Sequence, residues 1–254
     1  MYRSLALILA VAWAPAVLAR DPAEIRKSQR LEVAAATADL PLEGEILKGF
    51  ARALGVELRV TPAGSTTGAL QALADGRADL AAGGLVSQRD QRPGLGFSSE
   101  VFPTRFVAVN RAPAEAPSFI ESLRGANRIL APAASGAGAA VAAAKLPGFK
   151  TDTGATPDKA LASLRTEAGS VAVLGLLDAL GAKRTDPELQ LGVLLGDRQS
   201  VAFAVRHADA GLLAAINGHL GQLRTSPSYR ALIARSLGQE SLQILARSRL
   251  DATP

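Results

Sequence analysis

The stretch Ala69–Leu85, with the sequence ALQALADGRADLAAGGL, decides the fold class. Its first half places leucines on one face of a helix, and Ser65 or Thr66 just upstream can cap that helix. The small apolar residues within 79–84 then predict a buried strand. A short amphipathic helix that leads directly into an apolar strand is typical of α/β proteins.

The residues upstream extend this alternation. An alternating strand is predicted from residue 31 to about residue 37, and a helix from Glu45 with Gly55 placed to end it. A second strand follows near 58–60. Strands that alternate with helices in this way predict parallel β-α-β units with right-handed crossovers.

A second α/β block lies further along the chain. It is predicted to contain strands at 128–131, 171–174 and 189–194, a helix from Gly136, and a helix whose start is marked by Thr156 and Pro157. Two β-rich runs, 106–110 and 200–206, enclose this block, and the chain after Arg206 is predicted to be helical. We therefore expect two lobes joined by two crossovers: residues 20–110 plus 200–254 form lobe 1, and residues 111–199 form lobe 2.

The first nineteen residues have the pattern of a secretory signal peptide. Arg3 supplies a positive charge, an apolar run of 14 residues ends at Leu18, and small residues precede a cleavage site after Ala19. That run is shorter than the roughly 20 residues that span a bilayer, although a membrane anchor is the alternative. A lipid anchor would need a cysteine, which the sequence lacks. We expect a mature protein in the periplasm that begins at Arg20.

Composition excludes several kinds of chemistry. With no cysteine, the chain cannot build disulfides, thiol nucleophiles or cysteine-ligated metal sites, and two histidines make a multi-histidine metal site improbable. The net charge of +5 is spread over scattered basic residues rather than a stripe with stacking aromatics, so we expect no nucleic-acid partner. Gly136–Gly138 is a weak match to a dinucleotide motif, and no Gly-x-Ser-x-Gly elbow occurs. We expect no enzymatic activity and no cofactor.

Several segments resemble the bacterial extracellular solute-binding proteins of family 3. They are Leu70–Asp79, the following Gly83-Gly84-Leu85, the element Phe97-Ser98-Ser99-Glu100-Val101-Phe102, and the C-terminal stretch from Ser226 to Gly238. The resemblance covers roughly residues 25–245. It implies a two-lobed periplasmic binding protein of the type II fold, in which each lobe is a mostly parallel sheet flanked by helices and two hinge strands join the lobes.

The resemblance also implies a ligand site between the lobes. Backbone amides at Gly84 and Leu85 would contact the ligand, and an arginine on the next loop would bind its carboxylate. The matching position is Gln91, so the flanking Arg89 and Arg92 are the two candidates.

In lobe 2 the resemblance assigns the anion-binding turn to Ser135, which would also suit an ordinary helix cap. Asp178, one residue beyond the usual acidic position, would take the ammonium group, with Asp39 as an alternative partner for a cation. In the family, two aromatic side chains of lobe 1 pack against the ligand. Thr66 stands at one of these two positions, and the aromatic residue of the other position is also missing.

The function implied is the capture of a small zwitterionic or anionic ligand, such as an amino acid, for an ABC-type importer. A membrane permease or a sensor protein would be the partner, and we expect a monomer. The segments 171–178, 186–189 and 201–205 are also similar to the solute-binding module of membrane-bound lytic transglycosylase F. A sensory or cell-wall-associated binding module without a catalytic domain is therefore the alternative.

Overall fold

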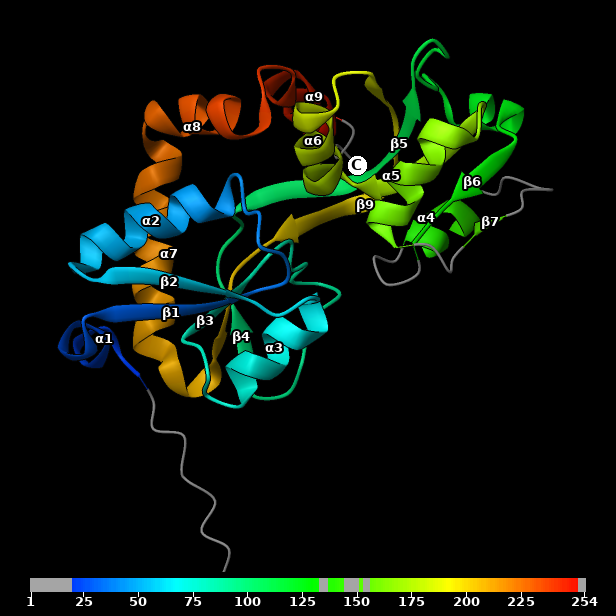
Figure 1. Ribbon diagram of the computed structural model, residues 1–254. Coiled ribbons are helices and arrows are strands. Elements are labelled where there is room, and N and C mark those ends of the chain that lie inside the picture. Colours follow the sequence, from blue (N-terminus) through cyan, green and yellow to red (C-terminus); the bar gives the residue numbers. More distant parts are fainter. Residues whose placement is uncertain (1–19, 133–136, 144–150, 153–155, 251–254) are drawn as a thin grey trace, which may run out of the picture.

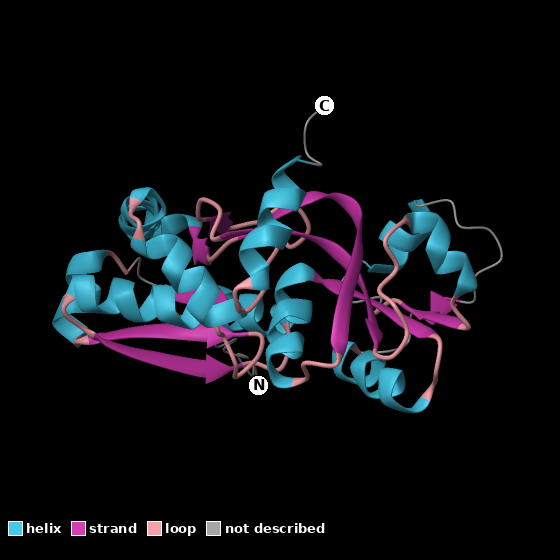
Figure 2. Ribbon diagram, turned by 90° about the horizontal axis from the view of Figure 1, so that it is seen from above, coloured by secondary structure: helices cyan, strands magenta, loops and turns pink. Residues whose placement is uncertain are grey.

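Two five-stranded sheets, each flanked by helices, form the two lobes of the protein (Figures 1 and 2). The computed structural model describes residues 20–132, 137–143, 151–152 and 156–250. In lobe 1 the strand order is β2-β1-β3-β10-β4, and in lobe 2 it is β7-β6-β8-β5-β9. The predicted two-lobed α/β fold is confirmed.

The sheet of lobe 1 begins with parallel strands. These are β1 (Arg30–Ala35), β2 (Glu57–Pro62) and β3 (Leu80–Ala82), and β1 lies between the other two. The returning strand β10 (Ala204–Arg206) inserts antiparallel between β3 and β4 (Leu95–Phe97). Two chain segments that are far apart in sequence therefore complete one sheet.

Helices α2 (Glu43–Leu54) and α3 (Thr66–Ala74) connect these strands. Helix α2 buries its apolar face and ends at Gly55, whose φ of +73° is the left-handed conformation that suits glycine. It begins two residues earlier than the periodicity predicts. Of the two possible caps of α3, Ser65 is the one that accepts a hydrogen bond from a first-turn amide, at 3.0 Å.

The sheet of lobe 2 combines parallel and antiparallel strands. Its parallel members are β6 (Arg128–Leu130), β7 (Thr151–Asp152) and β8 (Ser170–Gly175). The long strands β5 (Phe102–Arg111) and β9 (Leu189–Val201) pair with each other in antiparallel register. Chain connectivity makes β5 and β9 the two links between the sheets, because β5 follows β4 and β9 precedes β10 (Figure 1).

The described helical segments around this second sheet are a 3₁₀ helix (Ile120–Gly125), α4 (Ala137–Ala143), α5 (Pro157–Thr166) and α6 (Leu176–Thr185). Helix α6 begins directly where β8 ends, so its first turn lies at the carboxyl end of that strand. The start signal at Thr156 and Pro157 is observed: the Thr156 side chain accepts a hydrogen bond from the Lys159 amide.

The first and last described helices pack against the two sheets in different ways. Helix α1 (Pro22–Ser28) contacts both β1 and α7 (Ala210–Thr225), and a 3₁₀ turn (His207–Asp209) precedes α7. Helices α8 (Ser228–Leu237) and α9 (Glu240–Leu250) then reach lobe 2, where Arg184 donates to the Ser236 carbonyl at 3.0 Å. The C-terminal helices therefore contact both lobes. Among the described residues, no helix has the length and apolarity needed to cross a membrane.

Candidate ligand-binding site

Ionisable side chains from both lobes meet at the ends of β1, β3 and β8. Glu43 begins α2 after the loop that follows β1, and Gly83 and Gly84 follow β3. Arg89 lies on the next loop, and Asp178 lies in the first turn of α6. The charge of Asp178 acts on the carboxyl of Glu43, and the charge of Arg89 acts on that of Asp178, so these groups from opposite lobes lie within electrostatic range of one another. We refer to Glu43, Gly83, Gly84, Arg89 and Asp178 as the interlobe site.

Glu43 is the most buried acid of the interlobe site, with 2% of its surface exposed. Its two carboxylate oxygens accept hydrogen bonds from the Gly83 and Gly84 amides, at 3.1 and 3.0 Å. Burial raises the pKa of this carboxyl from 4.5 to about 7, the two amides lower it, and the nearby Asp178 raises it further. Glu43 therefore changes charge near neutral pH.

The conformation of Gly83 makes this arrangement possible. Its φ is +102°, and a Cβ atom there would lie 2.6 Å from the Ala36 backbone nitrogen. A side chain at Gly83 would thus collide with the residue that follows β1. The missing side chain lets the two amides turn toward the start of α2, where Glu43 accepts them.

Part of the Asp178 side chain is exposed to solvent, although many protein atoms lie around its carboxyl group. Desolvation by this surrounding protein raises the pKa of its carboxyl, Arg89 lowers it, and Asp158 at the start of α5 raises it. This environment is that of a group which a small solute can reach from the solvent.

Arg89 is held in place by its neighbour in sequence. Its guanidinium forms an ion pair with Asp90 at 2.9 Å, and the same Asp90 carboxylate accepts the Val86 amide at 2.8 Å. The loop is therefore anchored to the backbone that leaves β3. From this position the charge of Arg89 acts on Asp178 in the other lobe.

The structure places the other candidates as follows. Asp39 is exposed in the loop after β1, and Thr66 is the first residue of α3. Leu85 is fully buried, and the amide of Gly84 is taken by Glu43. Ser135 lies outside the described residues. Arg89 and Asp178 are thus the two candidates whose mutual proximity is visible.

Arg92 lies at a different place. It lines an open cavity of about 720 Å³ beside the edge strand β4 of lobe 1. The other lining residues are Ser87, Gln88, Gln91, Pro93, Leu95, Gly96, Phe97 and His207. This cavity takes its lining from lobe 1, whereas the interlobe site takes charged groups from both lobes. The lobe 1 cavity and the interlobe site are therefore two different places.

Glu43 and Asp90 are the residues that sequence reasoning missed. Acidic residues are common in the first turn of helices, so the position of Glu43 in α2 does not by itself indicate a binding residue. Its position after the first strand of a parallel sheet was the available clue, because ligands bind at the carboxyl ends of such strands. Within the described ranges, no group of three acidic or histidine side chains is arranged to hold a metal ion.

Solved structures of solute-binding proteins share this fold. Holo ArgBP from T. maritima superposes with a TM-score of 0.65 at 23% identity, over 84% of this chain and 98% of that chain. An ancestral cationic amino acid solute binding protein gives 0.72 at 18% identity, over 85% and 99%. A substrate binding protein of an ABC uptake transporter from Streptococcus pneumoniae, with bound histidine, gives 0.67 at 13% identity, over 85% and 96%.

Sequence comparison identifies the family directly. No curated protein matches the chain at a significant level. The family model of the bacterial extracellular solute-binding proteins, family 3, matches residues 42–239, which include every described strand except β1. The chain therefore belongs to the bacterial extracellular solute-binding proteins of family 3.

Proposed function

We propose that this protein is exported to the periplasm and binds a small zwitterion, such as an amino acid, between its two lobes. The observation that carries the proposal is the pair of opposite charges at the interlobe site, Arg89 from lobe 1 and Asp178 from lobe 2. An α-amino acid carries complementary charges, a carboxylate for Arg89 and an ammonium for Asp178. A ligand that contacts both lobes stabilises the closed state by its differential affinity for that state.

The acidic groups of the site favour a zwitterionic or cationic ligand over a purely anionic one. Glu43 accepts the amide of Gly84, one of the two amides that the family resemblance offers to a ligand, together with the amide of Gly83. Above pH 7 the negative charge of Glu43 adds to that of Asp178, and together they repel a ligand with a net negative charge. The proposal therefore leaves out the purely anionic ligands that the sequence analysis also allows.

The closed protein would deliver its ligand to the permease of an ABC-type importer. The division into lobes with residues 111–199 as lobe 2, the leader at residues 1–19 and the monomeric state belong to this proposal. The second sheet extends past this division at both ends, because β5 begins at Phe102 and β9 ends at Val201. A sensory or cell-wall-associated binding module is the second candidate. It is favoured by the occupied glycine amides and by Gln91 at the position where the family has its arginine.

Calorimetry on residues 20–254 with the common amino acids, organic acids and peptidoglycan fragments tests the proposal. A ligand at a hundred times its Kd raises stability by about 2.7 kcal/mol, so a thermal-shift screen can select the compounds. We expect Asp178→Asn and Arg89→Ala to abolish binding, since each leaves a ligand charge unpaired at a cost of about 2–5 kcal/mol.

Matched controls separate charge at the site from charge in general. Asp197→Asn changes an exposed acid of lobe 2, and Arg230→Ala changes an exposed arginine of α8. Both should bind as the unmodified protein does. If the Asp178 and Arg89 variants bind with the same affinity as the unmodified protein, the roles assigned to these two residues are refuted. Binding of peptidoglycan fragments without any amino acid would favour the second candidate.

A further inference from the structure

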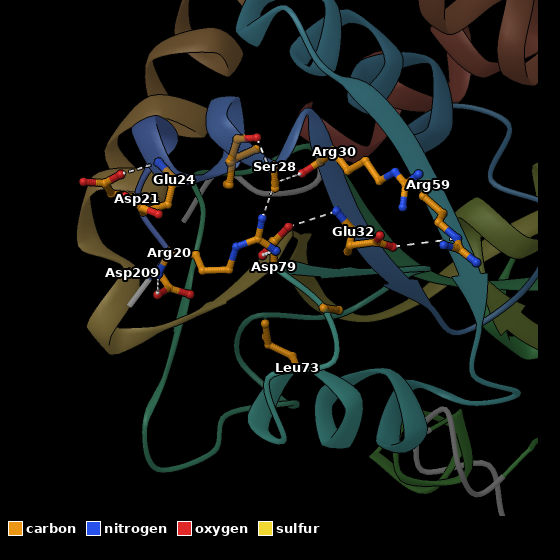
Figure 3. A network of polar contacts seen from close by, with 12 residues as sticks. Arg20, Asp21, Glu24, Ser28, Arg30, Glu32, Arg59, Leu73, Asp79 and Asp209 are labelled. Atoms are coloured by element: carbon orange, nitrogen blue, oxygen red, sulfur yellow. Dashed lines mark hydrogen bonds and ion pairs between the residues drawn. The ribbon is translucent and has the colours of Figure 1, made fainter. Parts of the chain in front are cut away.

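Arg20, the first described residue, enters a polar cluster on lobe 1 with both its backbone and its side chain (Figure 3). Its backbone nitrogen donates to Asp209 Oδ1 at 2.9 Å. Its guanidinium forms an ion pair with Asp79 at 2.9 Å and donates to Ser28. This residue follows the cleavage site that the sequence predicts after Ala19.

Asp209 is a buried carboxylate whose described partners are the Arg20 backbone nitrogen and the Arg206 guanidinium. The residue is 1% exposed, and its Oδ2 atom has no hydrogen bond of good geometry among the described residues. Arg206 lies 2.6 Å from Oδ2, but its Nη1 atom donates to two backbone carbonyls, those of Leu73 and Ala78. The ion pair uses Nη2 of Arg206, and the same guanidinium also serves two carbonyls and acts on the neighbouring Asp79, so Asp209 shares its one described cationic side-chain partner.

The position of Asp209 before α7 strengthens this point. An aspartate at a helix N-cap ordinarily accepts hydrogen bonds from the first-turn amides of its own helix. The side chain of Asp209 makes no such bond. Its described contacts are instead the Arg20 backbone nitrogen and Arg206, so the carboxylate faces the N-terminal segment.

We propose that Asp209 is the binding site for the α-ammonium group that cleavage of the Ala19–Arg20 peptide bond creates. A leader peptidase would hydrolyse this bond: water supplies the hydroxyl that completes the carboxyl group of Ala19, and the freed Arg20 nitrogen becomes an amine that takes up a proton at neutral pH. The inference rests on the leader cleavage of the proposed function, and it is independent of any ligand.

The existing geometry suits an ammonium group without rearrangement. A charged N–H donor and a carboxylate are normally 2.7–2.9 Å apart, and the Arg20 nitrogen is 2.9 Å from Asp209. An ammonium has three donors where the peptide nitrogen has one, so it can offer the buried carboxylate more hydrogen bonds. Its bonds to the carboxylate also carry a charge on both partners, whereas the peptide N–H bond carries a charge on the carboxylate alone. Processing would thus fasten the N-terminal segment, including α1, to the start of α7.

The test compares two purified proteins that differ by one residue. The first begins at Arg20, released from a cleavable fusion that leaves no extra residue. The second carries one alanine before Arg20, which keeps an amide at the same nitrogen and moves the ammonium away. We expect the first form to melt about 2–4 °C higher, the shift that one added charge-assisted bond produces in a chain of this size.

Asp209→Asn in both forms supplies the specificity control, because the difference between the forms should vanish when the carboxylate is gone. Should that variant fail to fold, acylation of the α-amine at pH 7, followed by mass spectrometry of the N-terminal peptide, gives the same information. An ion pair that raises the pKa of the amine by one unit makes acylation about tenfold slower than in the alanine-extended form.

Equal melting temperatures with equal acylation rates would overturn the binding of the ammonium group. N-terminal sequencing of the exported protein checks the cleavage: a first residue other than Arg20 would overturn that part of the inference. Neither readout involves a ligand, so a failure here is distinct from a failure of the proposed solute binding.

Discussion

The Glu43→Gln variant keeps the size of the side chain but cannot ionise. In the native protein Glu43 is 2% exposed, accepts the Gly83 and Gly84 amides, and has a pKa raised to about 7 by burial. A folded state with a raised carboxyl pKa binds its proton more tightly than the unfolded chain does. The stability that Glu43 contributes is therefore full below pH 4.5 and is lost as the pH rises through about 7.

The magnitude follows from the same values. The rise of the pKa of Glu43 from 4.5 to about 7 corresponds to about 3 kcal/mol, at about 1.4 kcal/mol for each pH unit. Glutamine has no such dependence. It presents one oxygen and one NH₂ group to two amide donors, so the variant loses a further constant amount of about 1–3 kcal/mol. The pH-dependent part of the difference between the two proteins should nevertheless be about 3 kcal/mol.

Urea denaturation followed by far-ultraviolet circular dichroism at pH 4.5 and at pH 8.5 measures this difference. Fluorescence is unsuitable for residues 20–254, because Trp13 is the single tryptophan of the chain and lies in the predicted leader. Native protein and variant share all other titrating groups, whose contributions largely cancel in the comparison. We expect the variant to gain about 3 kcal/mol relative to the native protein between the two pH values.

Glu45→Gln on the same helix is the control. Glu45 has a pKa lowered by its hydrogen bond to the exposed Lys48, so its removal should not produce a relative gain at high pH. Parallel pH profiles for the native protein and the Glu43 variant would refute the reasoning, because they would mean that Glu43 keeps its ordinary pKa in the folded state.

Three further substitutions test the packing around the site and the fold. Gly83→Ala should destabilise by more than about 2 kcal/mol in urea denaturation, because the new Cβ would lie 2.6 Å from the Ala36 nitrogen at a positive φ. Tyr229→Phe should cost about 1–3 kcal/mol by the same assay, since the buried hydroxyl donates to the Val101 carbonyl at 2.7 Å. Ser65→Ala removes the cap of α3 and should lower stability by about 1 kcal/mol.

Controls for these three substitutions come from the same chain. Gly94→Ala also has a positive φ but meets no atom within 4 Å, so it should cost less than Gly83→Ala. Thr67→Ala changes an exposed residue of α3 that does not cap the helix, and it should be close to neutral. Equal losses at both glycines would contradict the steric argument, and an unchanged Tyr229→Phe variant would contradict a stabilising role for its hydrogen bond.

Much of the architecture follows from local pattern. The helix before β3, the strands on either side of α2 and the start of α5 are visible in the spacing of apolar residues and in the capping residues. Boundaries were less accurate: α2 begins at Glu43 rather than Glu45, and β3 spans Leu80–Ala82 within the expected 79–84. A helix start without a side-chain cap leaves no mark in the apolar periodicity, which explains the first difference.

The sequence by itself determined the alternation of strands and helices, the two blocks and the family resemblance, because each depends on residues that are near one another in the chain. The interlobe site depends on residues from different lobes. Glu43, Gly83 and Asp178 come together only when β1, β3 and β8 are in place. The charge state of Glu43, the place of Arg92 in the lining of the lobe 1 cavity, and the contact of Arg20 with Asp209 were likewise decided by the tertiary structure. Burial and long-range proximity set these properties, and neither is written in the order of neighbouring residues.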